Sequence, residues 1–174
     1  MIDPTAVIHP KAHVEGSTIG ARTKVWQFAS VIRGTVLGED CTVAAGACLD
    51  GPVFGDRCII SPFVDMGPGF RVGNDVFIGP HVVLCNDVWP AVDKTGWDVE
   101  MLKDGRCVCV IVEDGASIGA HAVVMPGVRI GARAMIAANA TVTRDVPADH
   151  IWTRDGDLVP INGGWAKRRM RGAR

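Results

Sequence analysis

Apolar residues return at every sixth position along most of this chain. The spacing holds in two sets of large apolar residues, with a single five-residue step after Leu49. The first set is Val25, Val31, Leu37, Val43, Leu49, Phe54, Ile60, Met66, Val72, Ile78 and Leu84, and the second is Val112, Ile118, Val124, Ile130, Ile136 and Val142. A helix would return its apolar face after about 3.6 residues and a flat strand after two. A period of six therefore predicts short strands separated by corners.

Small residues occupy fixed places in the same repeat. Many of the 21 Gly follow the repeating apolar residue directly, as at Gly38, Gly55 and Gly79, and the fourth position after it is mostly small or branched. Each unit would place one large side chain in a stacked interior column, with glycine permitting the bend. Three units then close one triangular coil, which predicts an all-β solenoid.

Two segments carry a family resemblance, IGPHVVL (78–84) and VEDGASIGAHAVVMPGVRIGARAMIAANATVTRDVP (112–147). They resemble the hexapeptide-repeat acyltransferases over about residues 5–148, which implies a left-handed parallel β-helix. Only the resemblance gives the hand, because parallel crossovers are usually right-handed. We expect a β-helix acyltransferase domain at 1–150. A hairpin-like segment with a turn at Asp155-Gly156, followed by a basic tail, should occupy 151–174.

The repeat breaks between Leu84 and Val112, where CNDVWPAVDKTGWDVEMLKDGRCVC cannot maintain the column. This predicts one extruded loop at about 85–110. Long insertions in regular domains are usually functional or disordered, and the two Trp favour an ordered loop that packs on something.

Composition limits the possible partners and the compartment. The net charge of −1 gives no electrostatic reason to expect a nucleic-acid or membrane partner. The sequence shows neither a membrane-spanning apolar run nor a cationic, apolar export signal at its start. No CxxC pair occurs among the cysteines, so free thiols in a reducing cytoplasm are expected. The cysteines are Cys41, Cys48, Cys58, Cys85, Cys107 and Cys109.

The loop begins with two candidate catalytic residues, Asn86 and Asp87. LCNDVWP resembles the loop start of the nucleotide-aminosugar N-acetyltransferases, where an Asn in this place lies beside the acceptor amine. In relatives that acetylate hydroxyls the segment ends in His-Pro and the His is the base, whereas Trp89 and Pro90 stand here. Because an amine flanked by electron-withdrawing groups can titrate near the α-amino value of about 7.7–8.0, an amine acceptor suits this chain better. The alternatives are a loop-capping Asx turn for Asn86 and a solvated or turn-forming carboxylate for Asp87.

Two histidines occupy the same place in their repeats, His81 after Ile78 and His121 after Ile118. Both should point outward, where histidine is commonly a surface or interface residue but is also suited to proton transfer. His81 is the better catalytic candidate because it stands just ahead of the loop. The γ-class carbonic anhydrases share the fold and bind metal through three His, but Ala116 and Pro126 occupy the places that a third His would need. We therefore expect no metal.

The resemblance also implies a site for acetyl-CoA, along the coils at a subunit boundary. Its pantetheine arm would contact the small-residue corners Gly119, Ala120, Ala137 and Ala138. Thr143 and Arg144 match a Thr-Lys pair that lies close to the phosphates in the family. Corners need small residues whether or not CoA binds, so only the resemblance supports this site.

The resemblance is closest to the 3-amino-3,6-dideoxyhexose acetyltransferases, which use dTDP sugars, through VWQFASVIRG, VDMGPGF and CNDVWP. It implies an acetyl-CoA-dependent N-acetyltransferase for surface glycan (lipopolysaccharide) biosynthesis, acting as a cytoplasmic homotrimer. A 4-amino or UDP-linked sugar remains an alternative, as does a non-catalytic hexapeptide scaffold. The basic tail is either solvated or a contact for CoA phosphate or nucleic acid; its cations are Lys167, Arg168, Arg169, Arg171 and Arg174.

Overall fold

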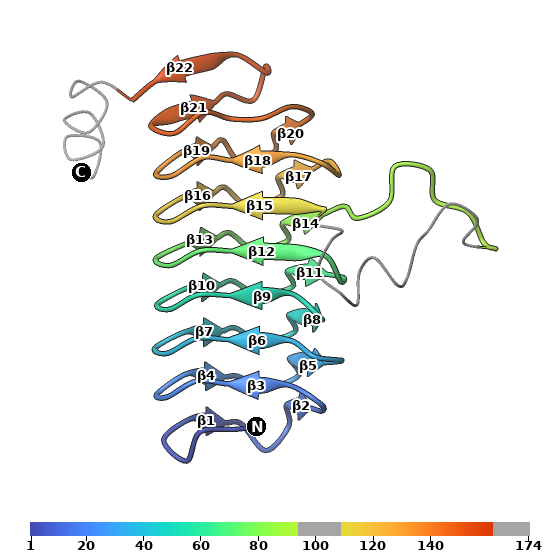
Figure 1. The fold of residues 1–174 in the computed structure, drawn as a ribbon, viewed down its shortest axis with the longest axis vertical. Coiled ribbons are helices and arrows are strands. Elements are labelled where there is room, and N and C mark those ends of the chain that lie inside the picture. The colour runs from blue at the N-terminus through green and yellow to red at the C-terminus, as the bar shows by residue number, and fades with distance from the viewer. Residues whose placement is uncertain (94–108, 162–174) are drawn as a thin grey trace.

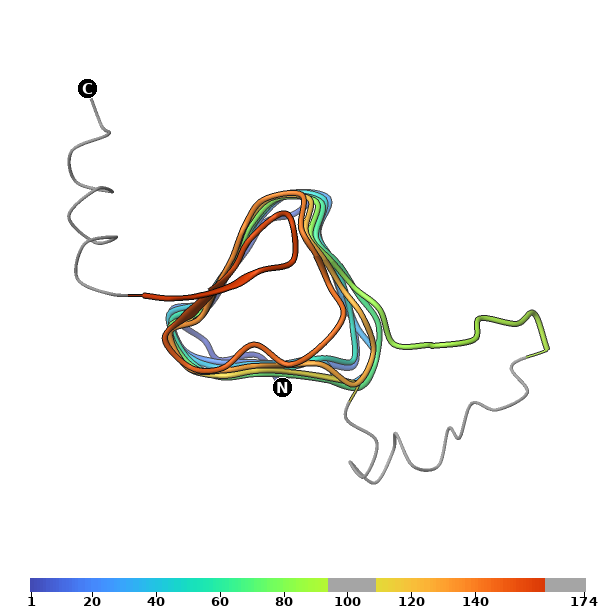
Figure 2. The same ribbon diagram turned by 90° about the horizontal axis from the view of Figure 1, so that it is seen from above.

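The computed structural model describes residues 1–93 and 109–161, which form short strands and no helix. No helix capable of crossing a membrane occurs in these two ranges. The strands lie on three faces of a solenoid with a triangular cross-section (Figures 1 and 2). The predicted all-β solenoid is therefore confirmed.

Each face is one sheet of stacked strands. The first face has nine: β1 (Val7–Ile8), β4 (Lys24–Val25), β7 (Thr42–Val43), β10 (Ile59–Ile60), β13 (Phe77–Ile78), β16 (Ser117–Ile118), β19 (Met135–Ile136), β21 (His150–Trp152) and β22 (Leu158–Pro160). The second has seven: β2 (His13–Val14), β5 (Ser30–Ile32), β8 (Cys48–Asp50), β11 (Asp65–Met66), β14 (Val83–Leu84), β17 (Val123–Val124) and β20 (Thr141–Val142). The third has six: β3 (Thr18–Ile19), β6 (Val36–Leu37), β9 (Val53–Phe54), β12 (Phe70–Val72), β15 (Val110–Val112) and β18 (Arg129–Ile130).

From β1 to β20 successive strands visit the three faces in turn, and strands in neighbouring coils pair in parallel. In Figure 1 the near strands run leftward while the chain climbs, so the solenoid is left-handed. The hand implied by the family resemblance is thus observed. The exception to parallel pairing is β22, which folds back antiparallel on β21.

The predicted interior column is confirmed, because every member of both six-residue sets is at most 5% exposed. Strand register places Val25, Val43 and Ile60 above one another on the first face. Complete burial of such a side chain contributes about 1.5–3 kcal/mol. Cys41 and Cys58 occupy small interior positions and are buried free thiols, as expected.

The five-residue step after Leu49 has a local cause at the corner between the second and third faces. One coil turns this corner through two residues with left-handed backbone, Arg33 (φ 50°) and Gly34 (φ 83°). The next coil turns it with Gly51 alone (φ 88°). The coil with Gly51 has one residue fewer between Leu49 and Phe54, and Phe54 still enters the core.

Each corner has a distinct side-chain character. The charged corner, between the third and first faces, stacks Arg22 on Asp40, Arg57 on Asp75, and Arg133 on Asp149, each through two hydrogen bonds. The aromatic corner, between the first and second faces, carries Phe28, Phe63, His81, His121 and Asn139, all with left-handed backbone. The glycine corner, between the second and third faces, carries Gly34, Gly51, Gly69 and Gly127.

The extruded loop leaves the solenoid at the glycine corner, between β14 and β15, which agrees with the predicted position (Figure 2). Coil stacking continues across the insertion, because β12 pairs with β15 and β14 with β17. At the other end of the chain, the predicted hairpin turn at Asp155-Gly156 joins β21 to β22. Tail residues 162–174 and loop residues 94–108, including Cys107, lie outside the described ranges.

Candidate functional site

His81 lies on the aromatic corner in a stack of rings. Its imidazole is 5.1 Å from the Phe63 ring centroid and 4.8 Å from that of His121, with the two imidazoles within 5° of parallel. Both histidines are exposed, as predicted. A ligand lying along this corner can therefore reach both imidazoles.

The four small residues predicted to line the CoA site come together on the same corner. Gly119 and Ala120 precede His121 in one coil, and Ala137 and Ala138 precede Asn139 in the next. A Cβ on Gly119 would lie 2.5 Å from the backbone nitrogen of Ala138, so this coil contact requires glycine. The requirement is structural, because glycine lets the two coils approach closely at this corner.

Thr143 and Arg144 line a hollow of about 410 Å³ beside the last coil. The other lining residues are Asn139, Thr141, Trp152, Arg154, Asp155 and Gly156. Arg144 lies with its guanidinium carbon 5.4 Å from the Trp152 ring centroid. Trp152 and Arg154 were missed at the sequence level, although Trp152 occupies the place above Ile136 in the interior column.

Asn86 is at the root of the extruded loop, on the glycine corner and therefore away from the aromatic corner. Its side-chain amide donates a 3.4 Å hydrogen bond to the carbonyl of Pro68 in the coil below, and its own carbonyl accepts from the Cys109 thiol. The residue is half-buried. Its carboxamide oxygen can still orient an external donor such as an amine.

Asp87 forms a turn, which was the alternative interpretation of this residue. Its carboxylate accepts a 2.9 Å hydrogen bond from the backbone N–H of Trp89, two residues on, which is an Asx turn. A direct catalytic role would require Asp87 to contact a ligand while it holds this turn.

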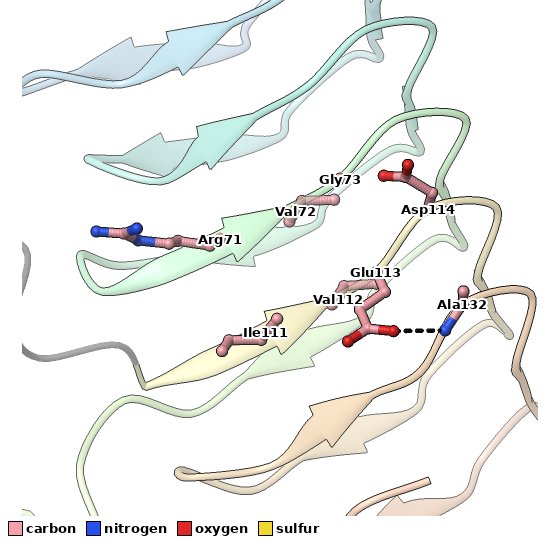
Figure 3. A pocket seen from close by; sticks show the side chains of 8 residues that line it. All are labelled: Arg71, Val72, Gly73, Ile111, Val112, Glu113, Asp114 and Ala132. Atoms are coloured by element: carbon pink, nitrogen blue, oxygen red, sulfur yellow. Dashed lines mark hydrogen bonds between the residues drawn. The ribbon is translucent and has the colours of Figure 1, made fainter. Parts of the chain in front are cut away.

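A second hollow, of about 430 Å³, lies on the third face (Figure 3). Its carboxylates are already bonded: Glu113 accepts from Arg129 and from the backbone of Ala132, and Asp114 accepts from the backbone of Asn74. Because these contacts join neighbouring coils, we assign Glu113 and Asp114 a structural role. Within residues 1–93 and 109–161, no group of three or more His, Cys, Asp or Glu is arranged to hold a metal ion.

Known repeat families match two segments of the sequence. Residues 109–144 match the bacterial transferase hexapeptide family (six repeats), and residues 15–50 match the hexapeptide repeat of succinyl-transferase. Both matched segments lie in coils of the observed β-helix.

Individual relatives match a larger part of the chain than these two segments. The bifunctional protein GlmU of Heliobacterium modesticaldum is 28% identical over 169 residues; the match covers 85% of this chain and 36% of that protein. This hexapeptide-repeat chain thus spans about a third of the length of that relative. A UDP-N-acetylglucosamine acyltransferase from Francisella novicida shares the fold (TM-score 0.62, 20% identity, covering 97% of this chain and 73% of that one).

A hexapeptide-repeat acetyltransferase from Vibrio cholerae, solved with acetyl coenzyme A, is more informative. It is 27% identical, with a TM-score of 0.56, and the match covers 71% of this chain and 68% of the other. That protein is an acetyltransferase that binds acetyl-CoA.

Proposed function

We propose that this chain is an acetyl-CoA-dependent N-acetyltransferase. The observation that carries the proposal is the similarity to the Vibrio cholerae acetyltransferase bound to acetyl-CoA. The acceptor would be the amino group of a nucleotide-linked amino-deoxysugar destined for a surface glycan, with a dTDP-linked 3-amino-3,6-dideoxyhexose as the first candidate. The reaction would take place in the cytoplasm.

The donor would lie along the aromatic corner. Its phosphates would occupy the hollow at Arg144, and its pantetheine arm would pass the small residues Ala138 and Ala120. Asn139 belongs both to this hollow and to the corner, two coils from His81. At about 4.8 Å per coil, His81 lies roughly 10 Å from Asn139, and the thioester end of the donor would lie beside the two imidazoles.

The acceptor amine would attack the thioester carbonyl directly. A carbon–nitrogen bond forms, the carbon–sulfur bond breaks, and the ammonium proton passes to the departing CoA thiolate. Positioning two bound substrates supplies about 7–11 kcal/mol of the barrier at best, whereas a general base contributes about 10² to 10⁴ in rate. Asn86 would orient the amine, and His81 would assist proton transfer, so no strong base is required.

The position of Asn86 bears on assembly. Within one chain it lies on a different corner from the proposed donor path. In a homotrimer with sites between chains, Asn86 of one copy and the aromatic corner of the next can face the same acceptor. We therefore include a homotrimer in the proposal.

Thiol release from acetyl-CoA with a panel of aminosugar nucleotides tests the activity. We expect turnover with a dTDP-linked 3-amino sugar; turnover with a 4-amino or UDP-linked sugar instead would revise the acceptor. The scaffold alternative predicts neither thiol release nor calorimetric binding of CoA at millimolar concentration. That pair of results would overturn the proposal.

A further inference from the structure

The stack of rings on the aromatic corner is interrupted at Gly46. Phe28, Gly46 and Phe63 occupy equivalent places in three successive coils, which backbone hydrogen bonds of 3.3 and 3.4 Å join in this register. Above Phe63 each coil carries one ring, with centroid distances of 5.1 Å to His81 and 4.8 Å from there to His121. Only Gly46 lacks a ring between Phe28 and His121 on this corner.

Gly46 keeps its position free of a side chain. A Cβ there would lie 2.6 Å from Cε1 and 2.7 Å from Cδ1 of Phe63, closer than real Cβ atoms come, so the Phe63 ring leans over the glycine. At about 4.8 Å per coil, the backbone at Phe28 and that at Phe63 are roughly 10 Å apart. One flat ring stacked between the two phenylalanines would repeat the spacing found above Phe63.

Both phenylalanines present much of their surface to solvent. Phe28 is 66% exposed and Phe63 is 57% exposed. His81 stacks on Phe63 from the coil above, whereas Phe28 contacts no other ring within residues 1–93 and 109–161. Two exposed aromatic side chains with a glycine between them favour a flat aromatic ligand, because stacking removes apolar surface from water on both of its faces.

Lys11 adds a positive charge beside these rings. Its ammonium nitrogen lies 5.7 Å from the centroid of the Phe28 ring, and Lys11 pairs with no carboxylate in the described part of the chain. The ligand that suits this arrangement is therefore both aromatic and negatively charged. A nucleoside diphosphate has these two properties, since its base stacks on aromatic side chains and its phosphates attract cations.

The Gly46 position is in line with the proposed chemistry. It lies two coils from His81 on the aromatic corner, and Asn139 lies two coils from His81 in the opposite direction. The proposed donor reaches His81 from the side of Asn139. An acceptor with its base at Gly46 would reach His81 from the other side, so that its sugar meets the thioester between the two.

We propose that Phe28 and Phe63 stack on the two faces of the base of the acceptor nucleotide, with Lys11 beside its diphosphate. The inference rests on the proposed function and adds residues that recognise the nucleotide part of the acceptor. A base in this position would also cover the exposed part of Phe63, which is compatible with a site between copies of the chain. Because every base has a π face, these rings select a nucleotide as a class.

Calorimetric titration of the full chain with dTDP tests the inference. Phe28→Leu and Phe63→Leu keep the apolar bulk but remove the ring, and each should weaken dTDP binding about fivefold or more, as loss of a base–aromatic contact implies. Phe28→Tyr keeps a ring and should retain most of the affinity. Phe77→Leu makes the same change at an exposed phenylalanine of the first face and should leave the dTDP affinity at its wild-type value.

Two comparisons separate the parts of the ligand. Lys11→Gln should weaken binding of dTDP and leave binding of thymidine unchanged, because thymidine lacks the diphosphate. CoA also contains a base, so each variant is titrated with CoA, whose affinity should not change. Melting temperatures near the wild-type value would show that the exposed substitutions leave the solenoid folded.

Two results would overturn the inference while leaving acetyl transfer intact. One is wild-type dTDP affinity in both leucine variants, and the other is a loss of CoA affinity in place of dTDP affinity. The exposed Trp89 of a second copy is the competing occupant. Absence of dTDP binding at millimolar concentration, together with a Trp89→Ala variant of lower assembled mass, would assign the position to that ring and overturn the inference.

The proposed function fails separately. Absence of thiol release with every aminosugar nucleotide would overturn it, whereas dTDP binding that still depends on both phenylalanines would support the nucleotide site.

Discussion

His81 and Asn86 lie at opposite ends of the two-residue strand β14, His81 on the aromatic corner and Asn86 on the glycine corner. Five extended residues span roughly 16 Å, so one acceptor amine does not contact both side chains of one chain. Either a single residue serves the amine, or two copies of the chain share the site.

Substitution of the two residues separates their roles. Asn86→Ala should lower kcat/KM, because the amide that orients the amine is lost. His81→Asn should retain most of the rate, because a neutral amine already carries its lone pair and the CoA thiolate can accept the proton. If His81 is instead the general base, its loss costs about 10² to 10⁴ in rate and changes the acidic limb of the pH profile.

His121→Asn is the matched control for His81→Asn, since it alters the same ring stack one coil away. Asp87→Asn needs the same kinetic comparison, with the Asx turn retained through the amide oxygen. A His81→Asn enzyme reduced to background, with fold, assembly and CoA affinity unchanged, would contradict the assignment of Asn86 as the essential group.

The assembly has a direct test in solution. We expect light scattering at micromolar concentration to give three times the 18.5 kDa mass of one chain. The exposed apolar side chains of Ile59, Phe63 and Phe77, on and beside the aromatic corner, are suitable for burial in such an assembly. A mass of 18.5 kDa would mean a monomer. Asn86 and the aromatic corner could then not face the same acceptor, and the proposed homotrimer would be wrong.

The core column gives a prediction about stability. Ile130→Ala should lower the free energy of unfolding by about 2–5 kcal/mol, because it removes a fully buried side chain and leaves a cavity. Arg133→Ala, on an exposed corner position of the next repeat, should cost far less. Urea unfolding measures both; equal losses would mean that burial does not follow the six-residue register.

Most of the solenoid was predictable because equivalent positions of successive repeats carry the same kind of residue. Ile78 and Ile118 enter the core at equivalent places, and so His81 and His121 had to emerge at equivalent places on the surface. The 18-residue relation between Asn86 and Pro68 follows from the same register. The six-residue period thus predicts the corner on which each of these residues lies.

The contacts of the last coil were not predictable in this way. The repeat ends near Val146, and the next coil is shortened, so register no longer determines that Trp152 lies above Ile136. The packing of Arg144 on that ring depends on the antiparallel return of β22, which the six-residue pattern does not encode. Likewise, Asp87 could be assigned to a turn only once its contact with Trp89 was observed.

The charged corner predicts how stability depends on pH. Hydrogen bonds from Arg22, Arg57 and Arg133 lower the pKa of their partner carboxylates Asp40, Asp75 and Asp149. Because each folded pKa lies below the unfolded value of about 3.9, the stabilisation is complete above that pH and is lost as pH falls through the folded pKa. These carboxylates should therefore leave the urea concentration at the unfolding midpoint unchanged between pH 7 and about pH 5. Below about pH 4 they should lower it.

Asp75→Asn isolates this contribution within the full acid response. The variant should be less stable than wild type at pH 7 and should lose less stability between pH 5 and pH 3, since one titrating carboxylate is gone. High salt should reduce the difference between the two proteins, because the Arg57–Asp75 pair is exposed to solvent. Asp155→Asn removes a carboxylate with no ion pair in the described ranges, so it serves as the control. If Asp75→Asn retained the full wild-type loss on acidification, the charged corner would not be the source of the acid sensitivity assigned to it.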